Sequence, residues 1–155
     1  MSEFIKILDE AAGKAGFNLT PLQLEQFDTY YRMLVETNKV MNLTALTEPQ
    51  DVAVKHFVDS LMAYDTYFPG KVLADVGTGA GFPGMPLKML RADIDISFVD
   101  STEKKLRFTT SVSERFSLDA HIFPARAEEL VAKGYREKYD IVVSRAVAAL
   151  PVLCE

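Results

Sequence analysis

Cysteine, tryptophan and histidine are scarce: the 155 residues include one cysteine, Cys154, no tryptophan and two histidines. A single cysteine excludes a disulfide framework and any zinc site built from several cysteines, and it fits a reducing environment. No apolar run approaches the roughly 18 residues that a membrane span needs, and the polar, amphipathic N-terminus is unlike a secretory signal. We therefore expect a cytoplasmic protein with no bound metal and no membrane partner.

A surplus of positive charge is also absent. The net charge is −5, and all of it falls on residues 1–69, whereas residues 70–155 are neutral overall. The chain as a whole therefore lacks the excess positive charge that is typical of nucleic-acid-binding proteins. A polyanionic partner would have to be bound by local clusters of Lys and Arg. The candidate cations are Arg91, Lys104, Lys105, Arg107 and Arg126. The 48% of hydrophobic residues is ordinary for one globular domain.

Residues 1–69 carry the hydrophobic spacing of helices, and we expect them to form an N-terminal helical subdomain. The first helix ends near Gly16, and a second begins at Thr20-Pro21-Leu22-Gln23, where a capping residue precedes proline. The second helix has an apolar stripe that consists of Leu24, Phe27, Tyr31 and Leu34. Thr47-Glu48-Pro49-Gln50 repeats the capping pattern, and we expect the next helix to pack through Val54, Phe57, Val58 and Leu61.

In residues 70–155 the spacing of hydrophobic residues is no longer that of helices alone. Short apolar runs at 71–76, 94–99, 120–123 and 139–143 alternate with segments that can form helices, at 84–91, 103–116 and 126–133. Such alternation predicts an α/β fold with a parallel sheet, of the Rossmann-like kind. The sequence thus predicts a second domain, 70–155, built around this sheet.

The strongest motif is the loop Asp75-Val76-Gly77-Thr78-Gly79-Ala80-Gly81-Phe82-Pro83-Gly84, which follows the first predicted strand. Its glycines allow a sharp turn and a close approach of the backbone to a ligand. We expect Gly77 or Gly79 either at positive φ or with its backbone so close to the ligand that a Cβ cannot fit. The dinucleotide fingerprint G-x-G-x-x-G fails because Phe82 stands where its third glycine would be. The pattern acidic-x-G-x-G-x-G instead resembles the first motif of class I S-adenosylmethionine-dependent methyltransferases. A purely structural turn is the alternative.

Asp100 ends the second predicted strand, 21 residues after Gly79. Ligands of open α/β sheets bind beyond the carboxyl ends of the strands. A carboxylate there can accept hydrogen bonds from both hydroxyls of a ribose. Together with the glycine loop, Asp100 predicts a site for an adenosine-containing ligand.

Further segments resemble one family, RsmG, also called GidB. They are Asn42-Leu43-Thr44, His56-Phe57-Val58-Asp59-Ser60-Leu61, the glycine loop, Asp100-Ser101 with Lys104-Lys105, Ala127-Glu128 and Ser144-Arg145-Ala146-Val147. The resemblance implies S-adenosylmethionine-dependent methylation of N7 of a guanine in 16S ribosomal RNA, with the small ribosomal subunit as partner. It also implies that the sheet stops after four of the family's seven strands, so that the chain is incomplete at its C-terminal side and the fourth strand is an exposed edge.

The same resemblance implies a set of cofactor-binding residues, which is Gly77, Phe82, Asp100, Ser101, Thr102, Ala127, Glu128 and Arg145. Glu128 could instead be an acidic residue that favours the first turn of a helix. Arg145 could be an ordinary surface arginine. A non-catalytic S-adenosylmethionine- or nucleotide-binding module remains the alternative function.

No catalytic residue is expected. N7 of guanine has an in-plane lone pair and loses no proton on methylation, so positioning can suffice and no general base is needed. Ser144-Arg145-Ala146 also lacks the Asn-Pro-Pro-aromatic motif used on exocyclic amines. Cys154 lies in a predicted helix past the last strand, and we interpret it as a small buried hydrophobic residue.

His56, Asp59 and Ser60 share one face of the predicted third helix, opposite Val54, Phe57 and Leu61. This polar face could be solvated, could hold a helix-stabilising His–Asp pair, or could line the cofactor or RNA cleft. The sequence leaves their roles open.

Overall fold

The computed structural model describes residues 1–145, so the predictions that concern Ala146, Val147 and Cys154 lie outside the described residues. Four parallel strands form one sheet: β1 (Val72–Val76), β2 (Asp95–Asp100), β3 (Ala120–Pro124) and β4 (Ile141–Ser144). Their order is β3-β2-β1-β4, and helices connect consecutive strands. The predicted α/β, Rossmann-like fold is thereby confirmed.

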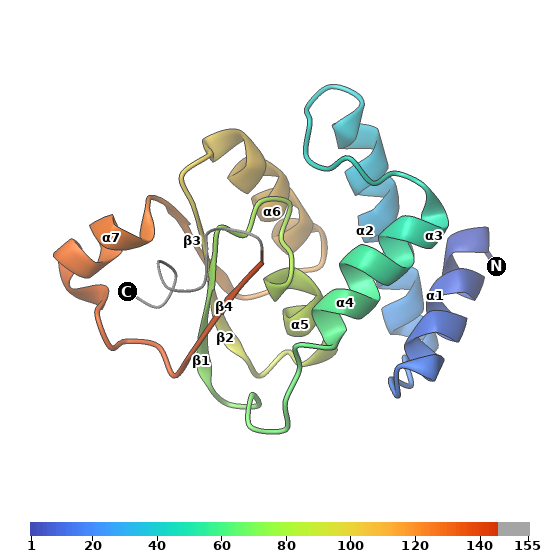
Figure 1. The fold of residues 1–155 in the computed structure, drawn as a ribbon, viewed down its shortest axis with the longest axis horizontal. Helices are drawn as coiled ribbons and strands as arrows, with labels where there is room; N and C mark the ends of the chain where they lie inside the picture. The colour runs from blue at the N-terminus through green and yellow to red at the C-terminus, as the bar shows by residue number, and fades with distance from the viewer. Residues whose placement is uncertain (146–155) are drawn as a thin grey trace.

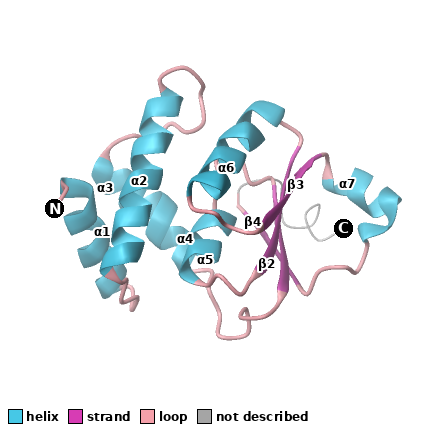
Figure 2. Cartoon of the chain, turned by 180° about the vertical axis from the view of Figure 1, so that it is seen from behind, coloured by secondary structure: helices cyan, strands magenta, loops and turns pink. Residues whose placement is uncertain are grey.

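Helices cover both faces of the sheet. On one side α5 (Gly84–Leu90) and α6 (Glu103–Arg115) lie between the sheet and the N-terminal helices, whereas α7 (Ala127–Leu130) with η2 (Val131–Tyr135) lies on the other side (Figures 1 and 2). β2 is the most buried strand, with Ile96, Phe98 and Val99 at 1% exposure or less, because it lies inside the sheet between two helical layers. Within residues 1–145, no helix is both long and apolar enough to cross a membrane.

The N-terminal part is helical as predicted. α1 (Glu3–Lys14) ends before Gly16, which has φ of 90°. α2 (Pro21–Asn38) begins with a full capping box, in which Thr20 and Gln23 bond reciprocally to each other's backbone N–H. One hydrophobic core runs from Phe4 and Phe27 through Phe57 to Phe98 of the sheet, so these helices and the sheet pack together. The division into subdomains at residue 69 stays a prediction.

The third helical segment differs from expectation. It runs as α3 (Pro49–Asp51), η1 (Val52–Val58) and α4 (Asp59–Leu61), and η1 has π-helical hydrogen bonding. The cap predicted at Thr47 is wrong: Glu48 is the capping residue, and it makes no side-chain bond. The helix begins one residue later than the sequence pattern predicts, with Pro49 as its first residue.

The faces of this segment are also not as predicted. Val54, placed in the apolar stripe, is 38% exposed, whereas His56 and Ser60, placed on the opposite face, are 9% and 0% exposed. Phe57, Val58 and Leu61 are buried as expected. The i→i+5 bonding of a π-helix changes the angular spacing of residues, so a 3.6-residue wheel assigns faces wrongly here.

Candidate functional site at the carboxyl edge of the sheet

The glycine loop crosses the carboxyl ends of the strands. Gly77, Gly79 and Gly81 have φ of 69°, 57° and 100°, which confirms the prediction of positive φ. The N–H groups of Gly77 and Thr78 both donate to the Val99 carbonyl oxygen, at 2.8 and 3.2 Å, which ties the start of the loop to β2. The loop therefore takes a conformation that only glycine adopts without strain.

The glycines differ in what surrounds them. A Cβ on Gly81 would lie 2.5 Å from the Tyr30 hydroxyl oxygen, and one on Gly84 would lie 2.6 Å from a carboxylate oxygen of Asp75. A Cβ on Gly79 would have no atom within 4 Å. Gly81 and Gly84 are thus required for packing, whereas Gly79 borders open space.

Asp75 joins the two ends of the glycine loop through hydrogen bonds of its buried side chain. Its Oδ2 accepts hydrogen bonds from the Thr78 hydroxyl (2.7 Å) and the Gly84 N–H (2.8 Å). Its side chain is fully buried, and Oδ1 has no hydrogen-bond partner among the described residues. Burial raises the pKa of this carboxyl to about 6, against the lowering effect of the Thr78 and Gly84 hydrogen bonds.

Asp100 connects the glycine loop to the end of β2. Its Oδ2 accepts from the Gly79 N–H and its Oδ1 from the Thr102 N–H, each at 2.8 Å. Each carboxylate oxygen can accept a further hydrogen bond. Asp100 and the glycine loop, which the sequence assigns to one ligand site, are therefore in direct contact, and acceptor capacity remains for a ligand.

The other predicted residues on this side lie on adjacent strand ends. Ser101 and Thr102 are exposed and follow Asp100 directly. Ala127 and Glu128 begin α7, just after β3, and Glu128 is exposed in its first turn. Pro124 pairs in register with Asp100, so the β2 and β3 ends are neighbours.

Arg145, just after β4, lies on the opposite side of the loop. Its Nη1 donates to the Lys55 carbonyl (3.0 Å) and to Asp59 Oδ2 (3.2 Å), and its Nη2 lies 2.8 Å from His56 Nδ1. The guanidinium carbon also lies 5.4 Å from the centre of the Phe82 ring. The Arg145 side chain is 29% exposed and is held by residues of η1 and α4.

Phe82 is the central ring of a stack. Tyr30 lies parallel to it on one side, with centroids 5.2 Å apart, and His56 lies nearly parallel to it, at 4.7 Å. Tyr30 also donates its hydroxyl to the Ala80 carbonyl oxygen at 2.6 Å. Two aromatic side chains from the N-terminal helices thereby fix the glycine loop.

The sequence pattern did not predict a role for Tyr30 and left the role of His56 open. Its helical stripe included Tyr31, which is partly buried, rather than the fully buried Tyr30. Among the polar residues left open, His56 and Asp59 contact Arg145, whereas the Ser60 hydroxyl bonds to the His56 carbonyl oxygen within its own helix. The Thr44 hydroxyl oxygen lies 2.7 Å from His56 Nε2. The family-like segment Asn42-Leu43-Thr44 was thus the one sequence feature that could have indicated a partner for His56.

The candidate RNA-binding cations are spread over the surface. Lys104, Arg107 and Arg126 are exposed near the carboxyl edge or on α6. Arg91 ends α5, precedes β2 and pairs with Asp93 at 2.9 Å, so it lies at the opposite, amino edge of the sheet. Among the described residues, no group of three His, Cys, Asp or Glu side chains is arranged to bind a metal.

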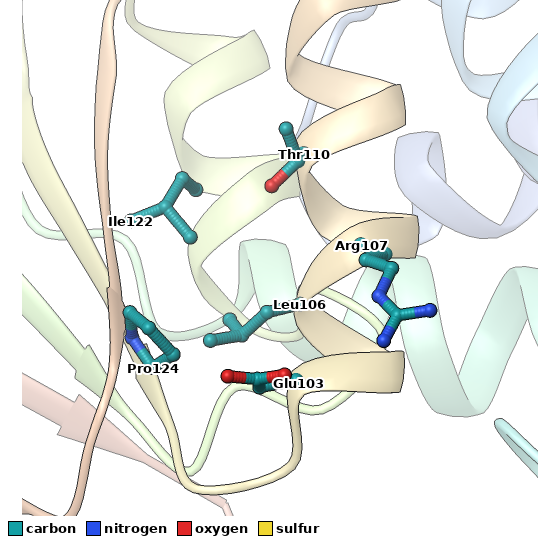
Figure 3. Close-up of a pocket in the computed structure, with 6 residues that line it drawn as sticks. All are labelled: Glu103, Leu106, Arg107, Thr110, Ile122 and Pro124. Atoms are coloured by element: carbon teal, nitrogen blue, oxygen red, sulfur yellow. The ribbon is translucent and has the colours of Figure 1, made fainter.

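Two hollows in the described part of the surface do not coincide with the predicted cofactor residues. One of about 200 Å³ lies between α6 and β3 and is lined by Glu103, Leu106, Arg107, Thr110, Ile122 and Pro124 (Figure 3). Another, of about 500 Å³, extends from the amino ends of β1 and β2 to η2. The candidate site is therefore identified by the glycine loop and the polar groups that converge on it, and not by a deep pocket. Such polar groups are what gives a site its specificity for a ligand.

Comparison with known proteins supports the resemblance. Residues 23–155 match the family model GidB, described as rRNA small subunit methyltransferase G. Relatives called ribosomal RNA small subunit methyltransferase G include that of Ligilactobacillus salivarius, 46% identical over 90% of this chain and 61% of its own length. Those of Staphylococcus epidermidis and Pelotomaculum thermopropionicum are 44% and 46% identical, over 97% and 100% of this chain and 64% and 66% of their own lengths. The chain thus spans a little under two thirds of these relatives, and it belongs to the rRNA small subunit methyltransferase G (GidB) family.

Proposed function

We propose that the chain forms the S-adenosylmethionine-binding part of an enzyme that methylates N7 of a guanine in 16S ribosomal RNA, in the small ribosomal subunit of the cytoplasm. Membership of the GidB family supports this proposal. The observation that carries it is the contact between Asp100 and the Gly79 N–H, which joins two ligand-binding elements at one edge of the sheet.

The residues of this edge fit the cofactor. Gly79 borders open space on its Cβ side, and Asp100 retains acceptor capacity for two ribose hydroxyls. The buried Oδ1 of Asp75, which has no hydrogen-bond partner among residues 1–145, is a further acceptor beneath the loop. The proposed binding residues are those predicted from the sequence: Gly77, Phe82, Asp100, Ser101, Thr102, Ala127, Glu128 and Arg145.

The proposed chemistry needs orientation rather than a base. S-adenosylmethionine, when bound, supplies an electrophilic methyl group. Because β3-β2-β1-β4 is the strand order, Asp100 and Arg145 lie on opposite sides of the glycine loop. Asp100 would hold the ribose, and Arg145 would border the side left for the guanine. No base would be needed, because N7 gains the methyl group as the methyl–sulfur bond breaks and loses no proton. The role of the chain is then to align the two reactants.

The test is methyl transfer to small subunits isolated from a strain that lacks this activity, with S-adenosylmethionine labelled in its methyl group. We expect label in 16S rRNA, and less label with Asp100→Asn at limiting S-adenosylmethionine. Binding of S-adenosylmethionine without transfer would instead support a non-catalytic module, and absence of binding would refute the cofactor assignment.

A further inference from the structure

His56 has an unusual environment for a histidine. It is 9% exposed, stacks on Phe82, and has a hydrogen-bonding partner at each ring nitrogen: Arg145 Nη2 at Nδ1 (2.8 Å) and the Thr44 hydroxyl at Nε2 (2.7 Å). In the sequence, Thr44 precedes His56 by 12 residues and Arg145 follows it by 89. His56 therefore links the loop after α2 to the residue after β4.

The partners determine the proton positions on the ring. A guanidinium has donors only, so Nδ1 must accept the hydrogen bond from Arg145. A neutral ring then carries its proton on Nε2, which donates to Thr44 Oγ1. The same oxygen also accepts from the Leu46 N–H at 3.1 Å, so Thr44 is held by the backbone beside it. A protonated ring would direct an N–H at the guanidinium and break this arrangement.

The electrostatic surroundings agree with a neutral ring. Burial, and after it the Arg145 guanidinium, lower the pKa of His56 to about 4, against the opposite effect of Asp59. Lys55 contributes its carbonyl oxygen to Arg145, while its ammonium group pairs with Asp51 at 2.7 Å. The cation that faces His56 is thus Arg145.

We propose that His56 is a positioning residue: its neutral ring, held in one tautomer by Thr44, orients the Arg145 guanidinium over Phe82 at the reacting side of the glycine loop. The part of this inference that concerns methyl transfer rests on the proposed function. The hydrogen-bond arrangement does not, because it can be observed in the chain without any substrate.

The first experiment is ¹⁵N NMR of the chain labelled in its histidines. Only His56 and His121 contribute, and His56→Phe identifies the signals of His56 while keeping a flat ring on Phe82. We expect His56 to be protonated on Nε2 and unprotonated on Nδ1 from pH 6 to 8, and the Nδ1 signal to shift in Arg145→Gln. Titration of His56 between pH 6 and 7, a proton on Nδ1, or a signal unaffected by Arg145→Gln would overturn the proposal.

The second experiment is a double-mutant cycle on kcat/KM for methyl transfer. The free energy of a hydrogen bond to a charged group corresponds to a factor of about tenfold to a hundredfold. We expect His56→Phe to lower kcat/KM by this factor. In the Arg145→Gln variant, His56→Phe should lower kcat/KM by less than about threefold, because the guanidinium that His56 positions is absent. Thr44→Val should resemble His56→Phe, and Thr44→Ser should restore activity.

His121→Gln is the matched control, since His121 lies on β3, where its Nε2 pairs with Asp95 at 3.2 Å, and we expect its activity to equal that of the wild type. Additive losses of His56→Phe and Arg145→Gln would mean a merely structural role and would overturn the proposal. If the wild type itself transfers no methyl group, the proposed function fails, and the NMR measurement alone decides the placement of Arg145 by His56.

Discussion

Replacement of Asp100 by asparagine is the sharpest test of how the cofactor edge is built. In the structure, each carboxylate oxygen accepts one backbone N–H, from Gly79 and from Thr102, both at 2.8 Å. Asparagine keeps one acceptor oxygen and places an NH₂ group against the other N–H. At least one hydrogen bond to a charged group is lost, which corresponds to about 1.5–3 kcal/mol. We expect the free energy of unfolding, measured with urea, to fall by about that amount.

The same change should weaken S-adenosylmethionine binding, measured by calorimetry, by about tenfold to a hundredfold, because a ribose hydroxyl loses its charged acceptor. A 2′-deoxy analogue should bind the wild type weakly and lose less on mutation, so the double-mutant cycle of protein and ligand should show coupling. Asp93→Asn is the control: Asp93 is exposed and pairs with Arg91 at the opposite edge, so ligand affinity should not change. Additive losses for Asp100→Asn and the 2′-deoxy change would show that Asp100 only caps the strand end, and would refute the ribose assignment.

The remaining predictions concern the glycine loop and two buried titratable groups. Gly79→Ala should cost about 1–2 kcal/mol of stability through its left-handed φ alone, whereas Gly81→Ala should cost clearly more, because its Cβ would also meet the Tyr30 hydroxyl at 2.5 Å; equal losses in urea unfolding would contradict this. The raised pKa of Asp75, about 6, makes the folded state bind its proton more tightly, so its contribution to stability is lost as pH rises from about 4 to 6. The lowered pKa of His56, about 4, has the opposite sign, and its contribution is lost as pH falls from about 6.5 to 4. Relative to wild type, stability should therefore rise more steeply with pH in Asp75→Asn and less steeply in His56→Phe; identical pH slopes in urea titrations would refute both placements.

The sheet and the glycine loop could be predicted from the sequence because their signals are local. Continuous apolar runs mark buried parallel strands, and glycines at alternate positions after the first of them mark a loop at positive φ. Asp100 could be placed at the same edge because carboxyl ends of parallel strands meet there. The two elements are indeed in contact, through the Gly79 N–H.

The His56 environment could not be predicted from local pattern. A π-helical segment rotates His56 and Ser60 into the interior and Val54 outward, against the 3.6-residue spacing. The partners of His56 lie 12 and 89 residues away, at Thr44 and Arg145, and no spacing rule reports contacts over such separations. Tyr30 was missed for the same reason, because its hydroxyl bonds to the loop 50 residues further along.

We propose that this chain supplies the S-adenosylmethionine-binding part of an enzyme that transfers a methyl group to N7 of a guanine in 16S rRNA. The most direct measurement is mass spectrometry of the nucleosides released from small subunits after incubation with the chain and S-adenosylmethionine, with subunits from a strain that lacks the modification. The account predicts 7-methylguanosine, at one molecule or fewer for each 16S rRNA, and a need for about tenfold to a hundredfold more S-adenosylmethionine to form it with Asp100→Asn. A different methylated nucleoside, or no methylation although S-adenosylmethionine binds, would contradict it.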